Sequence, residues 1–70
     1  MAAKSEIIKQ TANNVYQRVK QSTLQTIKAD LKRLELNKPK DSKSYMYIVY
    51  IGVKKGLNKR LRELQKPLKK

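Results

Sequence analysis

Apolar side chains recur at helical spacing through the first half of the chain. A first stripe, with spacings of four, three and four residues, consists of Ile8, Ala12, Val15 and Val19. A second stripe, with spacings of three, four and three, consists of Leu24, Ile27, Leu31 and Leu34. Each stripe fits one face of an amphipathic helix, so the pattern predicts helices over residues 5–20 and 22–36.

The phase of the apolar pattern slips between these stripes, because Val19 and Leu24 are five residues apart. Either the chain breaks here into a helix-turn-helix, or a single helix continues across the gap with a drifting stripe. Ser22 and Gln25 have the spacing of a capping box, in which each side chain satisfies a backbone amide at the start of a helix. This signal favours a break over residues 20–22 and a second helix that begins at Ser22.

A different pattern follows over residues 45–53, where tyrosine and β-branched side chains dominate. Both sets of alternate residues are apolar, so we expect a strand that is covered on both faces. Turn formers fill the preceding residues 41–44, and Pro39 restricts any strand before them to a short edge strand. The stretch 36–53 therefore predicts a β-hairpin.

The end of the chain is predicted to be helical again and strongly basic. A leucine stripe, with spacings of four, three and four, consists of Leu57, Leu61, Leu64 and Leu68. It predicts a short helix over residues 56–66, with Gly52 and Gly56 bracketing the loop that leads into it. Pro67 is expected to end this helix, and residues 67–70 are expected to form a basic tail.

The net charge of the chain indicates what kind of partner it binds. Eighteen Lys and Arg residues against five Asp and Glu give a formal net charge of +13 over 70 residues. Such an excess favours a polyanionic partner, and it opposes a compact fold through self-repulsion. A chain of this length is also near the lower limit for a self-sufficient core, so we expect a homodimer in which the second copy supplies the missing burial.

Several classes of function lack the residues that they need. The chain has no Cys and no His, so it has no disulfide, no zinc site of the usual kind and no imidazole for acid–base chemistry. The five scattered carboxylates show no catalytic or metal-binding spacing, so we expect no enzymatic activity, no cofactor and no metal. No apolar run approaches the ~20 residues of a membrane span, and the N-terminus lacks the apolar segment of a signal peptide. We therefore expect a cytoplasmic protein, nucleoid-associated when bound, with no membrane partner.

The second predicted helix has an outer face that suits the groove of a duplex. The side opposite its apolar stripe carries Ser22, Gln25, Thr26, Ala29 and Arg33, with Lys28 and Lys32 on the shoulder. Amide and guanidinium groups pair with base edges, hydroxyl groups bond to phosphate, and a small residue permits close approach. The alternative interpretation is the solvated face of an ordinary amphipathic helix.

A longer motif extends from residue 22 to residue 50. It consists of Thr26-Ile27, Asp30-Leu31, Leu34, Leu36, Lys38-Pro39 and Ser44-Tyr45-Met46-Tyr47. It resembles the winged helix-turn-helix regulators, above all the DNA-binding domain of bacterial arginine repressors and then the DeoR type, while excisionases share the order of elements. The resemblance implies a recognition helix over residues 22–36 and a β-wing over residues 36–53. The repressor domains place two helices before the recognition helix, whereas only one fits here.

The pattern and the resemblance together predict an α+β fold, a small winged helix-turn-helix with a single domain over residues 1–70. We expect it to bind double-stranded DNA as a small transcription regulator or excisionase-like accessory factor of viral or plasmid type, with the Lys-rich wing and C-terminus on phosphates. The residues expected to contact nucleic acid are Ser22, Thr23, Gln25, Thr26, Lys28, Lys32, Arg33, Lys38, Lys40, Lys43, Lys54, Lys55, Lys59, Arg60 and Arg62. RNA, as in a ribosome-associated protein, is the first alternative partner, and a membrane or partner protein is the second.

Overall fold

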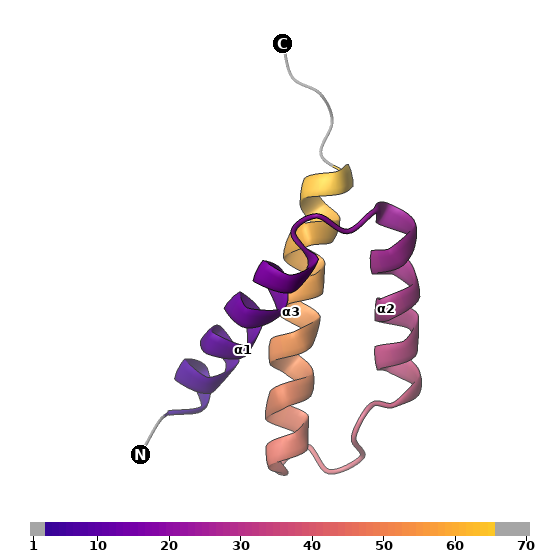
Figure 1. Cartoon of the computed structure of the whole chain (residues 1–70). Helices are drawn as coiled ribbons and strands as arrows, with labels where there is room; N and C mark the ends of the chain where they lie inside the picture. Colours follow the sequence, from indigo (N-terminus) through magenta and orange to yellow (C-terminus); the bar gives the residue numbers. More distant parts are fainter. Residues whose placement is uncertain (1–2, 66–70) are drawn as a thin grey trace.

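A computed structural model describes residues 3–65 and shows three helices. These are α1 (Lys4–Val19), α2 (Leu24–Leu36) and α3 (Tyr45–Gln65). In Figure 1, α3 lies in the middle, with α1 against one side of it and α2 against the other. The two N-terminal helices thus pack on α3 rather than mainly on each other, and α3 is the element that positions both of them.

The chain breaks between α1 and α2 where the slip in the apolar phase predicts it. α1 has its C-cap at Lys20, and α2 follows an N-cap at Thr23. The Oγ1 atom of Thr23 accepts a hydrogen bond from the backbone amide of Thr26 at 3.3 Å. A single helix across the gap is therefore wrong, and the cap lies one residue later than the expected Ser22.

The predicted β-wing over residues 36–53 is wrong. Residues 3–65 contain no strand, and the run 45–53 begins the long helix α3. The fold is all-α, and not the α+β winged helix-turn-helix that the resemblance implies. Strand propensity misleads here because the preference of tyrosine and β-branched residues for strands depends on what they pack against. Residues 56–65 of the helix predicted over residues 56–66 form the second half of α3, while residue 66 and the predicted tail 67–70 lie outside the described residues.

The turn formers before the apolar run start a helix instead of closing a hairpin. The Ser44 hydroxyl accepts a hydrogen bond from the amide of Tyr47 at 3.2 Å and donates one to the carbonyl of Asp41 at 2.8 Å. The Asp41 carboxylate in turn accepts the amide hydrogen of Lys43 at 2.9 Å. Serine is a favoured N-cap because its side chain satisfies an amide that has no partner within the helix. The segment therefore fixes the first turn of α3.

The apolar run over residues 45–53 is covered on both sides, as expected. It is a helix packed between two other helices, and not a strand in a sheet. Tyr50 and Leu57 share one face of the helix at a spacing of seven residues, and Tyr50 is hydrogen-bonded to α2 through its hydroxyl. Gly52 and Gly56 occupy the opposite face, which packs against α1. A helix between two others needs apolar or small residues on both of these faces.

Gly52 and Gly56 lie inside α3, so their predicted role at the ends of a loop is wrong. A Cβ atom at Gly52 would lie 2.5 Å from the Cβ of Thr11, and one at Gly56 would lie 2.6 Å from the carbonyl oxygen of Ala12. No such atom fits at either distance. The two glycines therefore let the backbone of α1 approach that of α3 closely.

The core is small and lies mainly between α2 and α3. The buried hydrophobic residues are Ile27, Tyr50 and Leu57, with exposed fractions of 0, 6 and 4%. Large hydrophobic residues also remain exposed at the end where α2 leads into α3, namely Leu36, Tyr45 and Met46. None of the helices in the described part of the chain has the length and apolar character that crossing a membrane requires.

Candidate functional site

The outer face of α2 is open to solvent. Ile27 is fully buried on the inner side of the helix, so the opposite side points away from α3. The exposed residues on that side are Gln25, Thr26, Lys28, Ala29, Lys32 and Arg33. α2 lies at the edge of the molecule and packs on α3 along one side (Figure 1). A partner can therefore reach this face along its full length.

No acidic side chain interrupts this outer face. The two acids of α2 lie elsewhere on the helix, because Asp30 is half-buried towards the inner side and Glu35 is engaged with α3. Three cations with two polar residues and one alanine remain, which gives the face a uniformly positive potential.

The loop lysines continue this positive surface beyond the end of α2. Lys38, Lys40 and Lys43, predicted to lie on the wing, occupy the loop between α2 and α3 and are all exposed. The ammonium group of Lys38 lies 5.9 Å from the centre of the Tyr50 ring, so this side chain is directed towards α3. Lys40 and Lys43 therefore remain as the loop lysines that can extend the positive surface of α2.

Lys54, also predicted to contact phosphate, is engaged within the protein. Its Nζ atom lies 2.9 Å from Oε2 of Glu35, and the hydroxyl of Tyr50 donates to the same oxygen at 2.7 Å. The hydrogen bond from Lys54, and then that from Tyr50, hold the pKa of Glu35 below its ordinary value. The bond to Glu35 raises the pKa of Lys54. These groups join α2 to α3, so Lys54 has a partner before any ligand arrives.

Ser22 and Thr23 lie in the turn between α1 and α2, and Arg60 of α3 contacts this turn. The guanidinium group of Arg60 donates to the carbonyl oxygen of Ser22 from Nε at 3.2 Å and from Nη2 at 2.9 Å. Ser22 is half-buried, and the side chain of Thr23 caps α2. These three predicted contact residues therefore have a structural role in holding the turn against α3.

A second polar contact joins α1 to α3. The hydroxyl of Tyr16 donates to Oε2 of Glu63 at 2.6 Å, and this bond lowers the pKa of Glu63 and raises that of Tyr16. Arg60 reaches the other carboxylate oxygen of Glu63 at 3.4 Å. The ammonium group of Lys59 lies 4.4 Å from the centre of the Tyr16 ring, within the range of a cation–π interaction.

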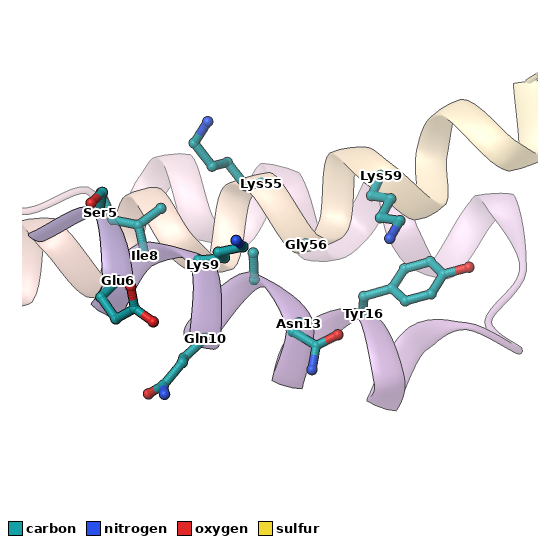
Figure 2. Close-up of a pocket in the computed structure, with 11 residues that line it drawn as sticks. Ser5, Glu6, Ile8, Lys9, Gln10, Asn13, Tyr16, Lys55, Gly56 and Lys59 are labelled. Carbon is teal, nitrogen blue, oxygen red and sulfur yellow. The ribbon is translucent and has the colours of Figure 1, made fainter.

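A groove of about 830 Å³ runs between α1 and α3 beside this contact. Figure 2 shows Lys59 directed from α3 towards Tyr16, Lys9 lying between the helices, and Lys55 extending outward from the α3 rim. The amide side chains of Gln10 and Asn13 line the α1 side. Lys55 belongs to the predicted contact set, and the neighbouring Arg62 is exposed on α3.

The α1 side of this groove was missed by the sequence analysis. Lys9, Asn13 and Tyr16 are spaced at four and three residues, so their common face is visible in the sequence. The groove itself forms because α1 packs across the glycine face of α3. A local sequence pattern cannot predict which two helices pack together. Only the tertiary arrangement brings the lysines of the two helices together.

Comparisons with known protein families, with curated proteins and with solved structures gave no match to this chain. Within residues 3–65, no cluster of His, Cys, Asp or Glu has the composition and geometry to hold a metal ion. The candidate surfaces are therefore the outer face of α2 with the loop lysines, and the groove between α1 and α3.

Proposed function

We propose that the protein binds double-stranded DNA through the outer face of α2. The observation that carries the proposal is the open, acid-free face formed by Gln25, Thr26, Lys28, Ala29, Lys32 and Arg33. A cationic helix face at the edge of a strongly basic molecule matches the electrostatics of a phosphate backbone. No wing takes part, because residues 45–53 are helical.

The dimensions of α2 support insertion in a major groove. Thirteen residues form a helix about 20 Å long, and the major groove of B-DNA is about 12 Å wide and admits a helix. Ala29 lies near the middle of the face and leaves room for close approach. Arg33 and Gln25 carry groups that pair with guanine and adenine edges, while Lys28 and Lys32 reach towards phosphates.

The loop lysines extend the contact along the backbone. Lys40 and Lys43 are exposed in the loop that follows α2, and from there they can reach the backbone of a duplex held on its outer face. They supply contacts that carry no sequence information and strengthen binding to any duplex. Double-stranded RNA is a poorer partner, because its deep and narrow major groove does not admit a helix.

Fluorescence anisotropy with a labelled 20-base-pair DNA duplex tests the proposal. The α2 variant replaces three cations of the outer face by Gln: Lys28→Gln, Lys32→Gln and Arg33→Gln. The α1 control removes the same charge from exposed positions away from this face: Lys4→Gln, Arg18→Gln and Lys20→Gln. We expect the α2 variant to lose at least tenfold more affinity than the α1 control, and the salt slope to fall by about one for each phosphate contact removed. Equal losses from the two variants would contradict the assignment to α2.

Base reading can be separated from backbone binding by selection from a random duplex pool. If Arg33 or Gln25 reads a base, alanine at that position relaxes the preference at one base pair by ~1–3 kcal/mol. Steep salt dependence without enrichment of any sequence instead assigns the protein an architectural role.

A further inference from the structure

The groove between α1 and α3 has a floor of backbone and rims of polar side chains. Gly56 has no side chain, and Ala12 and Val15 of α1 lie directly above it, so the two helices meet at the floor of the groove. Lys9, Gln10 and Asn13 line the α1 side, and Lys55 and Lys59 line the α3 side. Figure 2 shows Lys9 and Lys59 lying between the two helices, whereas Lys55 extends outward from the α3 rim.

The charge of the groove selects an anion. Three lysines line it against a single acid, Glu6, which lies near the N-terminal end of α1. Lys59 is held over the ring of Tyr16. Within the described residues, neither Lys9 nor Lys55 forms an ion pair. The site therefore presents two ammonium groups without acidic partners and one that is positioned by an aromatic ring.

The groove is short and open to solvent. Its lining runs along α1 from Ser5 to Tyr16, a rise of about 16 Å at 1.5 Å per residue. One extended strand can follow a groove of this length between two helices.

We propose that this groove binds a single nucleic-acid strand. Its phosphates lie against Lys9 and Lys59, with Lys55 at the outer rim, and its bases meet the amide group of Asn13 on the α1 side. Lysines that follow the backbone and side chains that meet exposed base edges are the usual components of such sites. The inference rests on the proposed function, because it assigns nucleic acid as the partner, but it uses a surface separate from the outer face of α2.

The test measures binding of labelled (dT)15, which forms no duplex, and of the 20-base-pair duplex to the same set of full-length variants. The groove variant carries Lys9→Gln and Lys55→Gln, and a charge control carries Lys4→Gln and Lys20→Gln. All four lysines are exposed and Gln is a good helix former, so circular dichroism is expected to show unchanged helix content. The α2 variant described above completes the set.

We expect the groove variant to lose at least tenfold more affinity for (dT)15 than the charge control does, with no excess loss for the duplex. Its salt slope on (dT)15 should fall by about 1.4, because each phosphate contact on a single strand contributes about 0.7. The α2 variant should show the opposite selectivity.

Three results would overturn the inference. One is an equal loss of (dT)15 binding in the groove variant and the charge control. The second is that the α2 variant, and not the groove variant, loses (dT)15 binding. The third is that polyglutamate binds as tightly as (dT)15 and loses affinity in the groove variant, which assigns an acidic peptide as the occupant. Failure of the duplex measurements alone contradicts only the proposed function, because the (dT)15 measurements are independent of them.

Discussion

The two interfaces of α3 are built in different ways. On one side, α2 contributes the fully buried Ile27 and α3 contributes the buried Tyr50 and Leu57, so the buried hydrophobic side chains come from these two helices. On the other side, α1 contributes no buried residue and lies against Gly52 and Gly56. One interface is stabilised by buried apolar area, and the other by the close approach that missing side chains permit. The same helix can therefore be disrupted by removing atoms on its α2 side and by adding them on its α1 side.

Removal of atoms on the α2 side is expected to have the largest effect. Ile27→Ala should lower the free energy of unfolding by ~2–5 kcal/mol, because it leaves a cavity in a core that has few buried residues. Urea or thermal unfolding followed by circular dichroism measures the change. Leu36→Ala removes a similar side chain from a position that is 78% exposed and should change stability by less than ~0.5 kcal/mol. Similar effects from both substitutions would contradict the burial of Ile27.

Addition of a methyl group on the α1 side should be the next largest effect. Gly56→Ala places a Cβ atom 2.6 Å from the carbonyl oxygen of Ala12, which belongs to the backbone and cannot move aside alone. Such overpacking costs ~1–3 kcal/mol and outweighs the gain of up to ~1 kcal/mol in helix propensity. We therefore expect a lower melting temperature in thermal unfolding.

A double-mutant cycle separates close approach from propensity. Gly52→Ala meets the side chain of Thr11, so Thr11→Gly should partly rescue it while leaving Gly56→Ala unrescued. If both alanine substitutions stabilise the protein, as they would in an uncrowded helix, the account of this interface is wrong.

Acid should weaken both interfaces, with a smaller effect than either glycine substitution. Glu35 on the α2 side and Glu63 on the α1 side have pKa values below their ordinary value of 4.5, because of hydrogen bonds from Lys54 and from Tyr16 respectively. A carboxylate with a lowered pKa in the folded state stabilises that state above its unfolded pKa, and this contribution is lost as the pH falls through the folded pKa. The melting temperature should therefore fall as the pH is lowered from 5 towards 3.

The contribution of each carboxylate to this pH dependence can be measured by replacement with Gln. Glu35→Gln and Glu63→Gln should each flatten the acid limb of the profile, whereas Glu6→Gln at an exposed position should flatten it less. The effects are modest because the side chains of Glu35 and Glu63 are 48% and 41% exposed, so water screens both contacts. An unchanged acid limb in both variants would exclude the two carboxylates as its cause.

The helical period was sufficient to predict the N-terminal half of the fold. The stripe containing Ile27 identified the inner side of α2, and this fixed which residues form its exposed face. The slip between Val19 and Leu24 located the break, although the cap is Thr23. These features depend only on residues that are close in sequence, so a sequence pattern is sufficient to predict them.

The C-terminal half could not be predicted in the same way. Residues 45–53 are apolar at both odd and even positions, and this pattern fits a covered strand or a helix between two others. Ser44 was a helix-start signal that was interpreted as a turn. Gly52 and Gly56 indicated a loop because glycine weakens an isolated helix. Their real role depends on α1, which is distant in sequence.

The candidate site also has one part that local sequence predicts and one part that depends on contacts between helices. The α2 face follows from local spacing, whereas the engagement of Lys54 with Glu35 and of Arg60 with Ser22 depends on contacts between helices. Local sequence could not distinguish these two cations from exposed ones such as Lys55. Lys9, the groove lysine of α1, was missed for the same reason, whereas Lys55 and Lys59 belong to the predicted contact set.

Chemical-shift mapping of the ¹⁵N-labelled protein with the 20-base-pair duplex tests the central claim most directly, because it locates the contact surface without any substitution. The account predicts that the amide signals that move most belong to residues 25–36 and to the loop lysines Lys40 and Lys43. Signals of Gly52 and Gly56, between α1 and α3, should move little. Perturbations centred on α1, or spread evenly over all exposed lysines, would contradict the assignment of α2 as the duplex-binding helix.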